Sequence, residues 1–90
     1  MITQENIMLH EIIGLYATVE RCSDIYLTNL SGRIIMETKN IIGIETSKGI
    51  KHISKTAAKR IRLNLKPDFS CYISGSLLIG RPEDRISKHR

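Results

Sequence analysis

Apolar and polar residues alternate along several short stretches of this chain, most regularly from Arg60 to Leu65. Successive side chains of a β-strand point to opposite faces, so this alternation predicts a strand with one buried face and one basic face. The inward residues are Ile61, Leu63 and Leu65, and the outward residues are Arg60, Arg62 and Asn64.

Further strands are predicted where β-branched and aliphatic residues run between turn-forming residues. Their ranges are Ile12–Cys22, Arg33–Thr38, Ile41–Thr46, Ile50–Ser54, Ser70–Ser74 and Leu77–Ile79, with an irregular loop over Ser23–Ser31. Lys39–Asn40 predicts a tight hairpin because asparagine tolerates left-handed backbone angles, and Ser47–Gly49 predicts a second one. This pattern is typical of an all-β fold, a small antiparallel barrel or sandwich.

Both ends of the chain instead predict short helices. Thr3 can cap a helix over Thr3–His10, and Pro82 suits the first position of a C-terminal helix. We therefore expect a single domain over residues 1–90, with an N-terminal helical segment (1–11), a barrel (12–79) and a C-terminal helix (80–90). Ninety residues suffice for one small hydrophobic core.

Positive charge is concentrated in the second half of the chain. Residues 1–47 carry three basic and six acidic residues (3 − 6 = −3), whereas residues 48–90 carry eleven and three (11 − 3 = +8). This asymmetry favours a nucleic acid or an anionic surface as partner; a basic face that serves only solubility is the alternative. No apolar run approaches the ~20 residues of a membrane span, and no signal peptide is evident, so we expect a soluble, cytoplasmic protein.

No arrangement of side chains predicts catalysis, a metal site or a cofactor on this chain. His10-Glu11 begins like a zinc-protease motif, but the fourth residue after His10 is Gly14. His52 lies in the basic stretch without a partner nucleophile, which favours RNA or surface contact over a general base. Cys22 and Cys71 belong to no paired metal motif and are expected to be reduced and buried. Few aromatic residues are present, so a structured RNA fits better than a stacked single strand.

Three stretches together resemble the archaeal ribonuclease P protein component 1 family, which is related to a eukaryotic ribonuclease P/MRP subunit. They are His10–Leu15, Gly32–Asn40 leading to Ile44-Glu45-Thr46, and Gly75–Arg85. The resemblance implies a six-stranded, Sm-like antiparallel barrel. It also implies a subunit of ribonuclease P, the endoribonuclease that removes the 5′ leader from precursor tRNA. Catalysis would then belong to the partner RNA and its magnesium ions, and a zinc-ribbon protein subunit would be a second partner.

Candidate site residues follow from the resemblance and from charge. Four positions match the family's motifs: Lys39, Asn40, Arg81 and Arg85. Charge and placement add Arg33, Lys51, His52, Lys55, Lys59, Arg60, Arg62 and Lys88 as RNA-binding residues. The expected contacts with the protein partner are Ile7, Met8, Ile12 and Ile86. The alternative functions are an RNA-binding barrel of another ribonucleoprotein and a protein-interaction adaptor.

Overall fold

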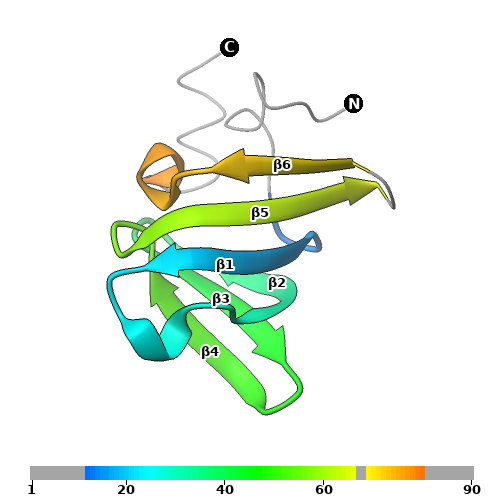
Figure 1. The fold of residues 1–90 in the computed structure, drawn as a ribbon, viewed down its shortest axis with the longest axis horizontal. Helices are drawn as coiled ribbons and strands as arrows, with labels where there is room; N and C mark the ends of the chain where they lie inside the picture. The colour runs from blue at the N-terminus through cyan, green and yellow to red at the C-terminus, as the bar shows by residue number, and fades with distance from the viewer. Residues whose placement is uncertain (1–11, 67–68, 81–90) are drawn as a thin grey trace.

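The computed structural model describes residues 12–66 and 69–80, which form an all-β protein (Figure 1). Six strands make one antiparallel sheet in the order β4-β3-β2-β1-β5-β6. The strands are β1 (Tyr16–Cys22), β2 (Ser31–Glu37), β3 (Ile41–Thr46), β4 (Gly49–Ser54), β5 (Ala58–Lys66) and β6 (Phe69–Ile73). Short 3-10 helices follow β1 and β6, namely η2 (Ile25–Leu27) and η3 (Gly75–Leu78). The predicted fold class is confirmed, whereas the helices expected at the two ends fall outside the described residues.

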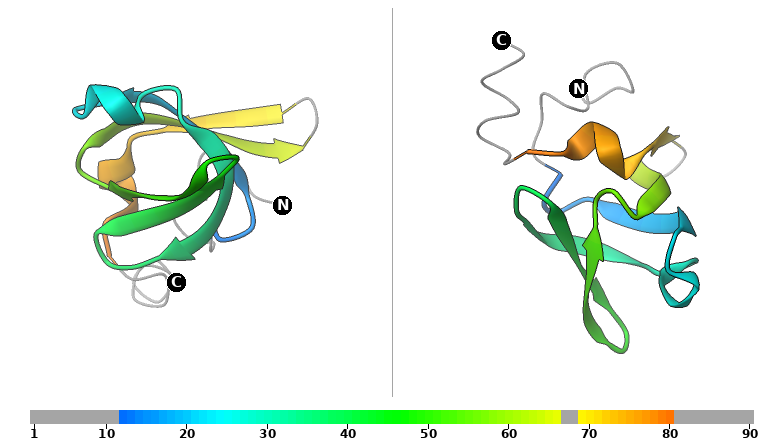
Figure 2. Two further views of the ribbon diagram at one scale, coloured as in Figure 1. Left: turned by 90° about the horizontal axis from the view of Figure 1, so that it is seen from below. Right: turned by 90° about the vertical axis from the view of Figure 1, so that its left-hand side faces the viewer.

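The sheet curls around a single aliphatic core (Figure 2). Buried side chains come from every strand and from η3, including Val19, Ile34, Ile44, Ile53, Leu63, Ile73 and Leu78. A flat sheet could not bring its two edge strands into one cluster, so the curvature is that of a small barrel. Among the described strands the ladder runs from β4 to β6 without pairing these two, which remain the sheet edges.

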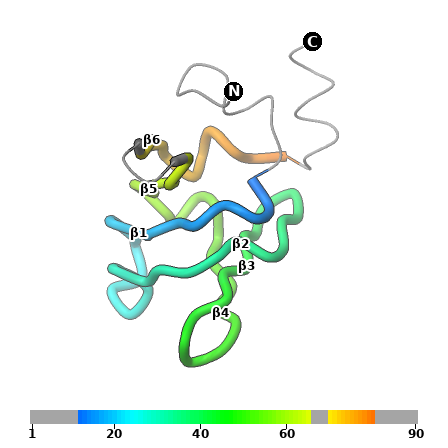
Figure 3. Tube along the Cα trace, turned by 90° about the vertical axis from the view of Figure 1, so that its right-hand side faces the viewer, coloured from blue at the N-terminus to red at the C-terminus, as the bar shows by residue number. Residues whose placement is uncertain are grey.

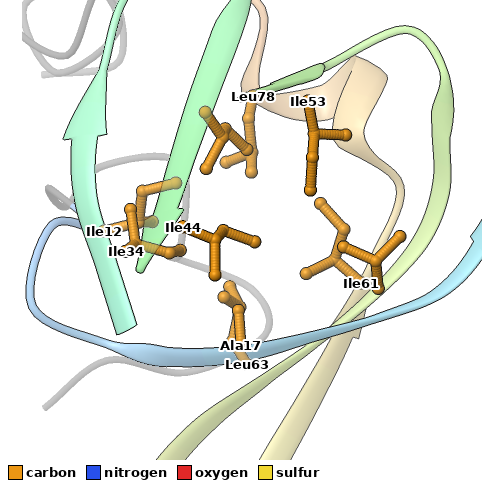
Figure 4. Close-up of a pocket in the computed structure, with 10 residues that line it drawn as sticks. Ile12, Ala17, Ile34, Ile44, Ile53, Ile61, Leu63 and Leu78 are labelled. Carbon is orange, nitrogen blue, oxygen red and sulfur yellow. The ribbon is translucent and has the colours of Figure 1, made fainter. Parts of the chain in front are cut away.

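The interior of this barrel is packed rather than hollow. The side chains in Figure 4 converge from several strands and leave a space of about 10 Å³, lined by apolar atoms. One water molecule needs at least this much room and also needs polar partners. Within the described residues, the core therefore has no room for a ligand.

Strand β5 confirms the predicted alternation. Ile61 and Leu63 are 2% and 0% exposed, whereas Arg60 is exposed on the opposite face. Pairing with β1 sets Val19 opposite Ile61, and both of these side chains are buried. Inward-facing Cys71 and Ile73 of β6 are also confirmed, whereas Cys22, which was predicted to be buried, is only partly buried.

Two predicted elements differ most from the structure, whereas the bounds of β2 to β6 lie within two residues of the predicted ones. β1 begins only at Tyr16, because Leu15 N donates to Ile12 O (3.1 Å) in a turn and Gly14 has a φ of 98°. The strand predicted over Leu77–Ile79 is wrong, since this segment belongs to η3 and its cap. Ser74 caps η3 by accepting from Ser76 N, and the apolar run has no alternation that would suit a strand.

The hairpin between β2 and β3 is confirmed, but its physical cause differs from the predicted one. Asn29, in the loop after η2, is the non-glycine residue with positive φ (68°) in the described ranges, so Asn40 does not use left-handed angles. Thr38 closes the turn instead: Thr38 N donates to Ile41 O (2.9 Å), and Ile41 N donates to Thr38 Oγ1 (3.1 Å).

No helix in the described part of the chain is long and apolar enough to span a membrane.

Candidate nucleic-acid interface

A group of basic side chains lies on the outer surface of β1 and β5. We call Arg21, Lys59, Arg60 and Arg62 the β5 cationic face. The β1–β5 register sets Arg21 opposite Arg60, and the β5–β6 register sets Arg62 opposite Tyr72. Opposite residues of an antiparallel pair share a face, so Arg21, Arg60 and Arg62 lie on one surface. Lys59 lies at the register shift between the Arg21 and Cys22 pairings, and its side chain lines a hollow together with Arg21 and Arg60.

One carboxylate, that of Glu20, lies among these cations. Arg60 Nε is 3.1 Å from Glu20 Oε1, and Arg62 Nη1 is 3.7 Å from Glu20 Oε2. Both arginines are partly exposed, at 52% and 39%, so each ion pair contributes at most about 1 kcal/mol to stability. Four cations and one carboxylate leave a formal charge of 4 − 1 = +3 on this surface. Glu20 thus orients the arginines without cancelling the positive charge.

A shallow hollow of about 310 Å³ lies at one end of this face. Its lining residues are Arg21, Lys59, Arg60, Tyr72, Ile73 and Ser74. The guanidinium carbon of Arg60 lies 4.4 Å from the ring centroid of Tyr72, a cation–π contact. Lys59 Nζ donates to Thr56 O at 3.0 Å, which uses one of its three N–H donors. Three cationic groups around one open hollow suit a phosphate group.

The other predicted RNA-binding residues lie away from this hollow. Lys51 and His52 are both exposed but are adjacent on β4, so they point to opposite faces of the strand. Lys39 and Asn40 are exposed in the β2–β3 turn. Arg33, on β2, is exposed and donates from Nη1 to Gly14 O at 2.7 Å. The predicted cations therefore do not form one continuous patch.

Lys55 is a correction to the predicted interface, because its side chain is fully buried. Its Nζ lies 2.7 Å from Glu37 Oε2 and donates to Leu78 O (2.7 Å) and Gly80 O (2.9 Å). A buried ammonium group needs this complete set of partners, because an unpaired charge in the interior is costly. Lys55 thus fastens the segment after η3 to the barrel and is not available for contact with RNA.

The predicted protein-partner residues are not brought together by the described structure. Ile12 is a second correction, since it is 0% exposed and belongs to the core. Residues predicted at the two ends lie outside the described ranges, namely Ile7, Met8, Arg81, Arg85, Ile86 and Lys88. Within residues 12–66 and 69–80, no group of three or more His, Cys, Asp or Glu side chains could hold a metal ion.

Sequence reasoning found only Lys59 and Arg60 among the residues that line the hollow, and the missed residues include Arg21 and Tyr72. Strict alternation after buried Val19 would turn Arg21 inward, but a register shift between Val19 and Arg21 brings it outward. This irregularity has no clear signal in the sequence. Tyr72 could have been found, because it alternates with Cys71 and Ile73, which were predicted to face inward.

A curved six-stranded antiparallel sheet with a packed interior and a basic outer surface places the chain among small, barrel-like all-β proteins. The family described as "Ribonuclease P/MRP, subunit p29" matches residues 5–88. The chain therefore belongs to the ribonuclease P/MRP subunit p29 family, which confirms the family resemblance of its three motifs.

Individual relatives agree with this assignment. A protein of Methanococcus maripaludis named "Ribonuclease P protein component 1" is 36% identical over 86 residues, which cover 93% of this chain and 90% of the relative. A protein of the same name in Methanococcus vannielii is 38% identical over 90 residues, which cover 93% of this chain and 88% of the relative. A solved structure, "Structure of Mth11: A homologue of human RNase P protein Rpp29", has a TM-score of 0.60 and 32% identity and covers 86% of this chain and 99% of Mth11.

Proposed function

We propose that this chain binds the RNA of ribonuclease P as one of its protein subunits and supports removal of the 5′ leader from precursor tRNA. The observation that carries the proposal is the β5 cationic face, with its formal charge of +3, on a protein of the p29 family. Lysine and arginine side chains that neutralise phosphates release condensed counterions, and this release supplies much of the affinity for nucleic acid.

In this proposal the chain contributes binding, and the RNA with its magnesium ions carries out the cleavage. Arg21 and Lys59 are exposed, and neither makes an ion pair with another residue of the described ranges. They are therefore the side chains best placed to meet phosphate oxygens. Arg60 and Arg62 are already oriented by Glu20 and add contacts in a defined geometry.

The remaining parts of the proposal follow from the family rather than from geometry. We expect a zinc-ribbon protein subunit as a second partner, precursor tRNA as an indirect one, and a cytoplasmic enzyme. No cofactor, membrane or small-molecule substrate is needed. An alternative role in another ribonucleoprotein predicts preference for a different RNA, and a protein adaptor predicts partner binding that barely responds to salt.

The test measures binding of the full chain to ribonuclease P RNA across a salt series. The double variant Arg21→Gln/Lys59→Gln removes two exposed charges and leaves the Glu20 ion pairs in place. We expect weaker binding and a slope of log affinity against log salt that is shallower by about one unit for each lost phosphate contact. Lys48→Gln is the charge control, because Lys48 lies in the β3–β4 turn, far from β6 in both Figure 1 and Figure 3.

Two outcomes would contradict the proposal. An affinity and salt slope equal to those of the unaltered chain would exclude the β5 cationic face as the RNA site. Tighter binding to a different structured RNA would instead favour a role in another ribonucleoprotein. Reconstituted precursor-tRNA cleavage with and without the chain then tests the role in the enzyme directly, and we expect cleavage to be more efficient when the chain is present.

A further inference from the structure

The side chain of Arg60 is held as a fixed plane rather than as a mobile charge. Its guanidinium carbon lies over the ring of Tyr72, 4.4 Å from the ring centroid, and its Nε lies 3.1 Å from Glu20 Oε1. The side chain nevertheless remains 52% exposed. These two contacts fix the orientation of the guanidinium before any ligand arrives, so little rotamer entropy is lost when a flat group binds to it.

The positive charge needed for a phosphate lies beside this plane. Arg21 and Lys59 line the same hollow as Arg60, and the register sets Arg21 directly opposite Arg60. The hollow is a shallow depression of about 310 Å³ where the ends of β1 and β6 meet the start of β5, three strands that lie side by side in Figure 1. A nucleotide can therefore enter it while still joined to the RNA on both sides.

We propose that this hollow holds one unpaired nucleotide of the bound RNA, with its base stacked on the Arg60 guanidinium and its phosphate between Arg21 and Lys59. The inference rests on the proposed function and names the part of the RNA that this site takes. Structured RNAs display unstacked bases in loops and bulges, and guanidinium planes are one of the surfaces on which such bases stack. Because stacking reads the face of a base rather than its edge, the site accepts any base.

The decisive variant is Arg60→Lys, which keeps the positive charge and removes the plane. The probe is a short single-stranded RNA with one 2-aminopurine, whose fluorescence rises when the base leaves its neighbouring bases in the strand. We expect the full-length protein to raise this fluorescence and Arg60→Lys to lose the increase. Its affinity for the oligonucleotide should fall about tenfold, in the range measured for loss of one base-stacking contact.

Controls separate this inference from the proposed function. Lys48→Gln should raise the fluorescence of the probe like the unaltered chain, and thermal unfolding verifies that each variant is folded. If Arg60→Lys raises the fluorescence and binds normally, or if the unaltered chain leaves the fluorescence unchanged, the nucleotide site is wrong. In either case the salt-dependent binding of ribonuclease P RNA, and its loss in Arg21→Gln/Lys59→Gln, can still hold. If the unaltered chain shows no salt-dependent binding of ribonuclease P RNA, the proposed function itself is wrong.

Discussion

Lys55 and Lys59 lie four residues apart in the most basic stretch of the chain, yet they have opposite environments. Lys55 is fully buried, forms an ion pair with Glu37 and donates hydrogen bonds to two backbone carbonyl groups. Lys59 is exposed and makes a single hydrogen bond, to a neighbouring turn. The turn at residues 55–57 separates them, directing one side chain to the interior and the other to the surface. Equal charges in a sequence therefore do not imply equal roles.

The sharpest test of this contrast is Lys55→Ala, for which we expect the largest loss of stability. The variant removes the ammonium group that Glu37 Oε2, Leu78 O and Gly80 O share. Breaking a buried ion pair by removing one partner costs about 3–5 kcal/mol. Urea unfolding would measure this loss, and RNA affinity per folded molecule should be unchanged.

Lys59→Ala is the matched control for this experiment. Its free energy of unfolding should stay within about 0.5 kcal/mol of the unaltered chain, because an exposed side chain with one weak contact is lost. Its affinity for RNA should fall. If Lys55→Ala and Lys59→Ala lowered the free energy of unfolding equally, the contrast between a buried Lys55 and an exposed Lys59 would be wrong.

Gly75→Ala tests the packing of η3 against the turn that carries Lys55. A Cβ atom at Gly75 would collide with the backbone carbonyl oxygens of Lys55 and Ala58. Relief of this collision requires a backbone shift, so we expect a loss of about 1–3 kcal/mol in the free energy of unfolding. Thermal unfolding monitored by circular dichroism would measure it. A variant as stable as the unaltered chain would show that η3 is not closely docked.

Glu20→Gln, on the exposed side of the comparison, should also change stability only slightly. Glutamine keeps an acceptor oxygen for Arg60 Nε but removes the negative charge, so the free energy of unfolding should change by less than about 1 kcal/mol. The formal charge of the surface rises from +3 to +4. RNA binding at low salt should therefore become tighter, with the difference shrinking at high salt. Weaker binding at low salt would mean that Glu20 itself contacts the RNA or its ions.

Residues whose roles depend on local patterns could be predicted from the sequence. Alternation in β5 identified Ile61 and Leu63 as buried and Arg60 as exposed, and the β3 range was predicted without error. The motif stretches also led to the correct family. Failures came where long-range packing overrides local preference. Lys55 and Gly80 are far apart in the sequence, and a 3-10 turn at η3 replaced the expected last strand.

By itself, the order of apolar and polar residues determined an all-β chain, the direction in which the β5 side chains point and the excess of positive charge, because these depend on neighbours within a strand. Only the tertiary structure decided which cations reach solvent. It buried Lys55 beneath the segment after η3, turned Arg21 outward through a register shift, and set Arg60 against Tyr72. These contacts join residues from different strands, and such pairings depend on how the sheet curls.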